Sequence, residues 1–494
     1  MRRVNTFLYL FCVSLVLSGC FNDNKKQALP PDTEAPVITL TGGNEVSVIL
    51  GDDYTELGAI VSDNVDTHLT AVVEGTVNTS ALGEYTLTYT ATDMAGNTAI
   101  TTRTVHVTMP TQTPFVFTVD ILPDSPSELP ISYQDKVIID WGDAGIALNS
   151  LTHPFSLEGQ YEIKVYGNIA FKFSDMGEAI FYHCEIKQWG EYAFTSMEGM
   201  FQHCGETLSI PSDAPNLTNV KSMEEMAANS VFNEDINHWD VSNVETMKDL
   251  FRSAKEFNQP LDNWNVAKVT DMSGMFSGAF SFDQPLNTWD VSNVRTMANM
   301  FYSSGFNHPI DNWNVSNVES MQHMFNEAGS FNQSLASWDV ANVNNMEAMF
   351  LRALSFNQPL NDWQVTNVTN MQSMFYFAQV FNQPLNNWDV SKVTHISEMF
   401  SYAKAFDQDL SSWALASIEQ EAAGLQGFLT GATSFSTANY DKLLTQWPNH
   451  AIANNITFDI SARFSNSGEV GRDILINQYG WTINDAGKVL EIVK

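Results

Sequence analysis

Four cysteines carry the most reactive side chains of the chain, and their positions divide them into two pairs. Cys12 and Cys20 lie within the first 20 residues, whereas Cys184 and Cys204 lie far downstream. Thiolates act as nucleophiles, as metal ligands or as halves of a disulfide. No histidine pair stands at metal-ligand spacing, which disfavours a metal site. Cys184 and Cys204 are therefore expected either to form a disulfide or to remain two buried thiols.

The residues before Cys20 have the features of an export signal. Arg2 and Arg3 form a basic start, and the apolar run from Phe7 to Leu17 is too short to span a bilayer. The Leu-Ser-Gly-Cys sequence that ends at Cys20 resembles a bacterial lipobox. This resemblance implies cleavage before Cys20 and attachment of lipid to its sulfur. The alternative is an ordinary signal peptide that has a cysteine near its cleavage point.

These features predict how the chain is delivered. We expect residues 1–19 to be a lipoprotein signal peptide, and residues 20–35 to be a lipidated, polar tether that contains proline. Several acyl chains on Cys20 would make anchoring stable. Phe21, not aspartate, follows that cysteine, which in lipoproteins of this type favours the outer membrane. The expected location is the surface of the cell envelope, which permits disulfides.

Three aspartates in two polar segments have the chemistry of a calcium site. Asp63 and Asp66 belong to an Asp-Asn-Val-Asp segment, and Asp93 begins Asp-Met-Ala-Gly-Asn. Carboxylate oxygens are the ligands that Ca²⁺ prefers. Aspartate and asparagine also form turns, and this second interpretation is preferred. Structural Ca²⁺ is the one cofactor that these residues suggest, and no other is expected.

Catalysis needs a unique constellation of polar residues, and the sequence offers none. The histidines His308, His323 and His395 follow no common spacing and lack a matching nucleophile and acid. No phosphate-binding loop or zinc-ligand spacing is present. We therefore predict that the protein is not an enzyme.

The charge of the chain excludes two classes of ligand. The formal net charge is −34 at pH 7. So acidic a surface repels nucleic acid and anionic membranes. The expected partner is an extracellular protein or glycan, with the membrane contacted only through the lipid anchor.

Eight tryptophans recur at a nearly constant interval and reveal a repeat array. Around them runs the template Trp-Asp-Val-Ser-Asn-Val-x-x-Met-x-x-Met-Phe-x-x-Ala-x-x-Phe-Asn-Gln-Pro-Leu. A period in the twenties is typical of stacked solenoids, in which each coil buries its apolar face against the next. The spacing is 25 residues except for one interval of 24, and the positions are Trp239, Trp264, Trp289, Trp313, Trp338, Trp363, Trp388 and Trp413.

Each coil is predicted to contain a strand followed by a helix. Trp264 and Val266 alternate at strand period, and the apolar residues from Val269 to Ala279 follow the spacing of a buried helix face. Ser242 and similar serines precede a glutamate at capping-box distance. The Phe-Asn-Gln turns are expected to stack their amides from coil to coil, at Asn258, Asn307, Asn332, Asn357 and Asn382.

One column of residues, directly after each tryptophan, is predicted to face outward from the strands. Carboxylates alternate with amides along it, which limits repulsion between strands ~4.8 Å apart. We interpret this outward column as the candidate binding face, with a solvated face of purely structural residues as the alternative. Its members are Asp240, Asn265, Asp290, Asn314, Asp339, Gln364 and Asp389.

Short alternating strands before the array predict two all-β modules, over residues 36–108 and 115–174. The segments Asp63-Asn64-Val65-Asp66, Ala91-Thr92-Asp93-Met94-Ala95-Gly96-Asn97 and Asp32-Thr33-Glu34-Ala35-Pro36-Val37-Ile38 resemble bacterial Ig-like domains. Thr67 replaces the glycine usual after the first of these. The Trp141-Gly142-Asp143-Ala144-Gly145 turn resembles that of PKD-type modules, with an alanine inserted.

The repeat template resembles the BspA-type repeat of bacterial surface lipoproteins, which are often grouped with leucine-rich-repeat proteins. The closing segments Phe435–Leu444 and Tyr479–Ile483 extend this resemblance. It implies attachment to a host, neighbour-cell or matrix target, with an envelope glycan-binding or purely structural role as the alternative. The expected fold is multidomain, with two N-terminal β-sandwich (Ig-like) modules and then an α/β leucine-rich-repeat-like solenoid. The solenoid is expected over residues 185–415, with a degenerate coil and cap over 416–494.

Overall fold

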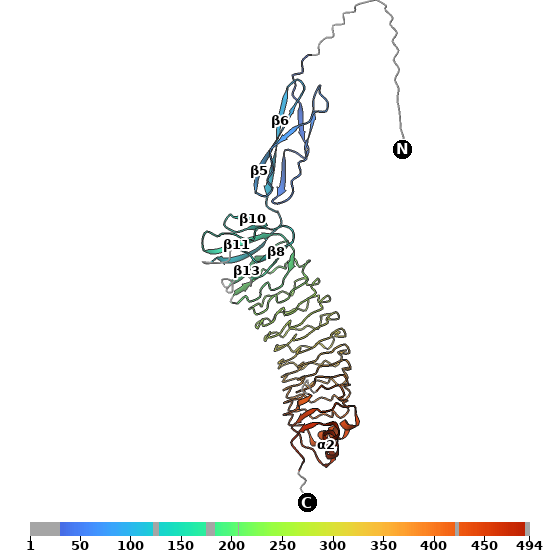
Figure 1. Cartoon of the computed structure of the whole chain (residues 1–494). Helices are drawn as coiled ribbons and strands as arrows, with labels where there is room; N and C mark the ends of the chain where they lie inside the picture. Colours follow the sequence, from blue (N-terminus) through green and yellow to red (C-terminus); the bar gives the residue numbers. More distant parts are fainter. Residues whose placement is uncertain (1–29, 122–127, 174–182, 206, 420–423, 490–494) are drawn as a thin grey trace, which may run out of the picture. The chain divides into compact units, whose positions relative to one another are not determined.

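The computed structural model describes residues 30–121, 128–173, 183–205, 207–419 and 424–489. The predicted signal peptide and Cys20 lie outside these ranges, as does most of the predicted tether. The chain divides into two compact units, Met1–Met109 and Pro110–Lys494. Figure 1 shows strands in the first unit and at both ends of the second unit, and it shows the α-helices close to the C-terminus.

The first unit is built from two β-sheets. β1 pairs with β3, and the other four strands form a sheet in the order β2-β6-β5-β4. Side chains alternate along β5 and β6, so that Leu87, Tyr89 and Val105 form the core. The strands are β1 (Val37–Leu40), β2 (Glu45–Ile49), β3 (Ala59–Ser62), β4 (Val72–Glu74), β5 (Gly83–Thr92) and β6 (Thr98–Thr108).

A buried arginine cross-links this unit. The Arg103 side chain is fully buried and forms an ion pair with Glu56, which also accepts a hydrogen bond from the hydroxyl of Tyr89. The guanidinium also donates to the backbone oxygens of Gly43 and Gly58 at 3.2 and 3.3 Å. Because a buried charge must be paired and hydrogen-bonded, this network is structural.

The second unit begins with strands that join directly to the repeats. One sheet has the order β10-β9-β11-β7-β13-β15, and a second has the order β14-β12-β8. One continuous core extends from Phe115 to Trp481. The strands are β7 (Phe115–Ile121), β8 (Ile131–Tyr133), β9 (Ile138–Asp140), β10 (Ile146–Leu148), β11 (Gly159–Tyr166), β12 (Ile169–Phe171), β13 (His183–Gln188), β14 (Phe194–Ser196) and β15 (Thr207–Ser209).

Residues 215–415, called the repeat stack below, form coils that lie one above another (Figure 1). Single parallel β-bridges join each coil to the next at equivalent template positions. The bridged residues are Ser222, Thr246, Asp271, Thr296, Ser320, Asn345, Asn370 and His395.

The predicted helix in each coil is wrong. Among the described residues between β14 and β16 there is no α-helix. The backbone N–H groups alternate instead: that of Met247 donates to the next coil, whereas that of Leu250 donates back to Met247. The Met-x-x-Met-Phe segment is thus a pair of tight turns that shares the apolar spacing of a helix but bonds to its neighbour.

Two residues in each of these segments, four positions apart, have left-handed backbone conformation. In one coil they are Gly274 (φ 63°) and Gly278 (φ 70°), and in another they are Ser373 (φ 53°) and Phe377 (φ 59°). One coil later, Tyr402 (φ 57°) occupies the same position as Phe377. A left-handed residue ends each turn, which prevents the helical path from continuing.

Aromatic columns fill the core of the stack. From Trp289 to Trp413, successive indoles lie 6.4–6.5 Å apart and within 3° of parallel. The phenylalanines from Phe251 to Phe400 stack at 5.6–5.7 Å. Such offset stacking adds to the free energy gained from burial.

The predicted amide ladder is present at the Phe-Asn-Gln turns. The side-chain Oδ1 of Asn332, for example, accepts the backbone N–H of Asn357 at 3.0 Å. Equivalent bonds of 2.9–3.0 Å connect the other coils. The ladder satisfies turn donors that the backbone alone leaves unpaired.

A mixed α/β segment closes the C-terminal end of the stack. Its three parallel strands have the order β16-β17-β18, and the N–H of Phe400 bonds to the carbonyl of Phe428 on β16. The elements are β16 (Leu425–Leu429), α1 (Thr437–Gln446), the 3₁₀ helix η4 (Trp447–Asn449), β17 (Thr457–Ile460), α2 (Asn466–Tyr479) and β18 (Thr482–Asn484).

The tryptophan N–H groups yield a testable difference between two coils. Trp338 Nε1 donates to the carbonyl of Ile310 at 3.0 Å, whereas no partner among the described residues reaches the buried Nε1 of Trp239. Trp338→Phe should therefore lower the free energy of unfolding by about 1–3 kcal/mol more than Trp239→Phe. Urea unfolding of both variants measures this difference, and equal losses would show that the bond contributes nothing.

Candidate functional site

The predicted outward column is exposed along the whole stack. In six of its seven members, the side-chain Oδ1 accepts the backbone N–H two residues further on, at 3.0–3.2 Å. Gln364 is the exception, and its amide donates to the carbonyl of Asp362. The column therefore closes a turn in six coils, and its use as a binding face stays a prediction.

These turns stabilise the ionised form of several aspartates. Hydrogen bonds from the serine two residues on, Ser242, Ser292 and Ser391, lower the pKa of Asp240, Asp290 and Asp389 respectively. A carboxylate that accepts hydrogen bonds in the folded chain is favoured over its protonated form.

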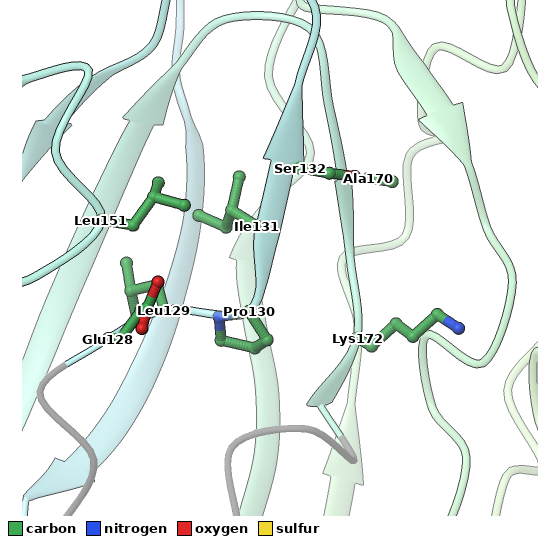
Figure 2. A pocket seen from close by; sticks show the side chains of 8 residues that line it. All are labelled: Glu128, Leu129, Pro130, Ile131, Ser132, Leu151, Ala170 and Lys172. Carbon is green, nitrogen blue, oxygen red and sulfur yellow. The ribbon is translucent and has the colours of Figure 1, made fainter.

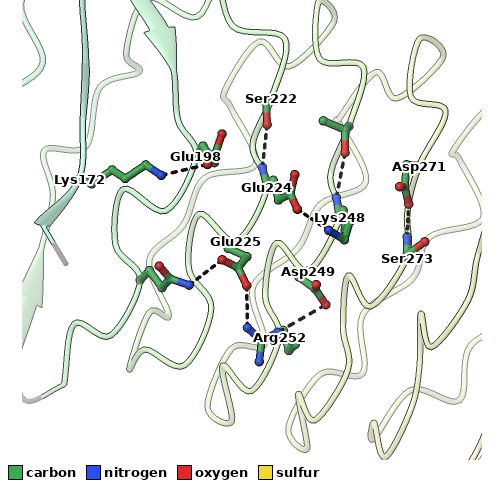
Figure 3. Close-up of polar contacts among 12 residues, drawn as sticks. Lys172, Glu198, Ser222, Glu224, Glu225, Lys248, Asp249, Arg252, Asp271 and Ser273 are labelled. Carbon is green, nitrogen blue, oxygen red and sulfur yellow. Dashed lines mark hydrogen bonds and ion pairs between the residues drawn. The ribbon is translucent and has the colours of Figure 1, made fainter. Parts of the chain in front are cut away.

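A different surface of the stack changes character along its length. Its first coils carry a charged network, defined by Glu224, Glu225, Lys248, Asp249 and Arg252 (Figure 3). Lys248 pairs with Glu224 at 2.5 Å, and Arg252 pairs with Glu225 at 2.7 Å and with Asp249 at 3.5 Å. Burial raises the pKa of Asp249 despite the nearby cations. This network joins successive coils through their side chains.

Further along the stack, the same template positions carry an aromatic cluster. Tyr376 occupies the position of Arg252, and Phe377 and Tyr402 occupy the next one. The ring of Tyr402 lies 5.6 Å from that of Phe377 and 6.0 Å from that of Tyr376. Tyr402 is 41% exposed. Tyr376 and Phe377 are half-buried. Aromatic clusters that are partly exposed, as here, are typical of interaction sites.

The backbone makes this aromatic cluster unusual. Phe377 and Tyr402 both stand at the left-handed position, where a bulky residue is an outlier. Two other coils have Gly278 and Gly431 there. Sequence reasoning missed the cluster, although two aromatic residues at a position held by small or polar residues in most other coils were a visible signal.

The structure revises the predicted calcium ligands. Asp63 and Asp93 lie close together, with Asp32 as the third member, and ligand atoms of all three lie within 4.8 Å of one another. Asp66 is outside this group, because its carboxylate accepts the backbone N–H of Met94. Asp32 lies within residues 20–35, the predicted tether.

The two downstream cysteines are joined. The Sγ atoms of Cys184, on β13, and Cys204 form a disulfide of 2.05 Å, and both residues are buried. The bond connects the sheet at the start of the second unit to the first coils.

One cavity of about 480 Å³ lies beside β8 and β12 (Figure 2). Glu128 and Lys172 stand on opposite sides of it, and the remaining lining is mostly apolar. The described lining holds no histidine and only one carboxylate, so it offers no acid–base pair for catalysis. The lining residues are Glu128, Leu129, Pro130, Ile131, Ser132, Leu151, Ala170 and Lys172.

Two family models match the chain. One, described as a bacterial surface protein Ig-like domain, matches residues 38–107. The other, described as Mycoplasma protein of unknown function DUF285, matches residues 195–305, 287–379 and 337–442, which together cover just over half of the chain. The chain belongs to the DUF285 family. Together the matches indicate a protein of the bacterial cell surface.

Solved structures that match part of this DUF285 protein include a bacterial lipoprotein. The crystal structure of a lipoprotein from Bacteroides thetaiotaomicron is 17% identical, with a TM-score of 0.14. The match covers 27% of this chain and 56% of the lipoprotein, just over half its length. No curated protein matches. In the part of the chain that the structure describes, no helix is long and apolar enough to cross a bilayer.

The lowered pKa values predict a specific response to acid. The double variant Asp290→Asn/Asp389→Asn removes two carboxylate charges. It keeps the oxygen that accepts the turn N–H, as the side chains of Asn265 and Asn314 do in other coils. An aspartate whose pKa is lower in the folded chain than in the unfolded chain stabilises the fold at pH values above its unfolded pKa of about 3.9. This stabilisation is lost as the pH falls through the pKa of the folded state. The wild type should therefore melt slightly above the variant near neutral pH, with the gap closing below about pH 4.

Thermal melting of both proteins across this range measures the gap. A gap that stays constant down to about pH 2.5 would show that these carboxylates do not contribute through their charge.

Proposed function

We propose that this protein is a lipid-anchored binding protein of the cell surface, whose repeat stack attaches the cell to an extracellular protein or glycan. The target would be carried by a host, a neighbouring cell or the matrix. The observation that carries this proposal is the partly exposed aromatic cluster on a stack whose other surface side chains are mostly polar. The proposal includes lipid attachment at Cys20, an outer-membrane location and membership of the BspA-type leucine-rich-repeat class.

The aromatic cluster has the properties of a contact site. Core packing does not require these side chains, since Gly278 and Gly431 fill the equivalent position elsewhere. Tyrosine and phenylalanine rings supply large contact area with few rotatable bonds, and they are enriched at the centres of interfaces. Val380, in the coil of Phe377, and Leu354, one coil earlier, are also exposed, at 41% and 46%. The patch suits a ligand with apolar faces, such as a protein surface or a sugar ring.

The outward column is the competing face. Its carboxylates are exposed and acidic, which suits a polar partner or one bridged by cations. Its side chains, however, already accept turn hydrogen bonds. We therefore place the ligand on the aromatic cluster rather than on the outward column.

Anchoring can be tested at the proposed lipid-bearing cysteine. Cys20→Ala removes the only thiol at the lipobox position, so the protein should leave the membrane fraction and lose incorporated fatty acid. Cys12→Ala, within the predicted signal peptide, is the matched control and should leave both unchanged. Fractionation and metabolic labelling with fatty acid measure the result, and a Cys20→Ala protein that stays membrane-bound and labelled would contradict the anchor.

Binding can be tested with variants that preserve the stack. Phe377→Gly/Tyr402→Gly removes two rings at positions where other coils already have glycine, so the melting temperature should change little. We expect at least about a tenfold loss of affinity for target cells or for an immobilised glycan that binds the wild type. Whole-cell binding and a glycan array measure this loss.

The control for this experiment is Asp290→Ala/Asp339→Ala on the outward column. Its binding should match the wild type. If the column variant loses binding and the glycine variant keeps it, the ligand lies on the outward column. If the wild type binds neither cells, proteins nor glycans, the protein has a purely structural role.

A further inference from the structure

Three carboxylates meet at one end of the first unit. Asp32 precedes β1, Asp63 follows β3 and Asp93 follows β5. Antiparallel pairing of β1 with β3 places Val37 opposite Ser62, which brings the chain entering the unit beside the end of β3. Asp93 is only 6% exposed. Among the described residues, no lysine or arginine forms an ion pair with any of the three.

The local hydrogen bonds leave two of these oxygens without donors. Asp63 Oδ2 accepts the N–H groups of Val65 and Asp66, and Asp32 Oδ1 accepts from Asn64 and from the backbone of Glu34. Asp63 Oδ1 and Asp32 Oδ2 are buried, and no donor among the described residues reaches either atom. A buried, ionised oxygen without a partner is unfavourable, and several like charges together make it more so.

We propose that Asp32, Asp63 and Asp93 bind one Ca²⁺ ion. Ca²⁺ takes oxygen ligands at about 2.3–2.6 Å, so oxygens around one ion lie up to about 5 Å apart. The ligand atoms here, all within 4.8 Å of one another, fit that spacing. Water or nearby backbone oxygens would complete the six to eight ligands that Ca²⁺ takes. The ion supplies the two unpaired oxygens with a partner and offsets the carboxylate charge.

The position of the site gives the ion a mechanical role. Asp32 lies at the junction between the predicted tether and β1, and its backbone oxygen already accepts from the side chain of Asn97 at 3.3 Å. Ca²⁺ would fasten this entering segment to the loops after β3 and β5. An affinity on the order of 10⁻⁴–10⁻³ M, as in extracellular calcium modules, would keep the site filled outside the cell.

The test uses the full chain, stripped of cations with a chelator and then titrated with CaCl₂. Amide hydrogen exchange should slow in peptides covering residues 32–37, 63–66 and 93–97, with half-saturation in the millimolar range or below. Local readout is needed because the 57 acidic residues also attract Ca²⁺ weakly elsewhere.

Asp63→Asn is the decisive variant, because its amide oxygen can still accept the two turn N–H groups. This substitution should raise the CaCl₂ concentration for half-maximal protection at least tenfold. Its hydrogen exchange without Ca²⁺ should match that of the wild type. Asp66→Asn is the matched control and should respond like the wild type. Absence of protection by Ca²⁺, equal protection in Asp63→Asn, or an equal response to MgCl₂ would each overturn the assignment.

Discussion

The repeat stack depends on hydrogen bonds that leave one coil and end on the next. In each Met-x-x-Met-Phe segment, alternate backbone N–H groups donate to carbonyls of the following coil, as from Phe251 to Met275 at 2.9 Å. A single coil cannot satisfy these donors, and unpaired buried donors are strongly unfavourable. Both ends of the stack therefore need closure, which the sheets around β13 and the segment containing β16 provide.

Much of this architecture was predictable from the spacing of residues, because the core is periodic. The tryptophan interval and the amide ladder follow directly from the template. The helix was wrong for a physical reason: Met247, Leu250, Phe251 and Ala254 are buried at helical spacing whether the chain forms a helix or two tight turns. What separates these alternatives is the bonding partner in the next coil, which local periodicity does not encode. The paired glycines Gly274 and Gly278 were the one local hint.

The candidate sites show the same division between local and distant information. Asp63 and Asp93 were recognisable from the segments around them, but Asp32 joins them only through pairing of β1 with β3. Asp66, next to Asp63 in sequence, serves a turn instead. The aromatic cluster does not follow from the repeat pattern, because Phe377 and Tyr402 depart from the template. Side chains that depart from the template, such as Phe377, are those that the scaffold does not require.

The stack also constrains how such a protein changes in evolution. Because most coils present similar donors, acceptors and stacked rings to their neighbours, gain or loss of one 25-residue unit by recombination between such coils leaves the junctions chemically little changed. The shorter interval before Trp313 shows that even single-residue deletions are absorbed in the loop, at Gly305. Each unit gained or lost would shift a distal patch by about 4.8 Å relative to the start of the stack. Copy number can thus adjust the reach of a surface protein without redesign of its core.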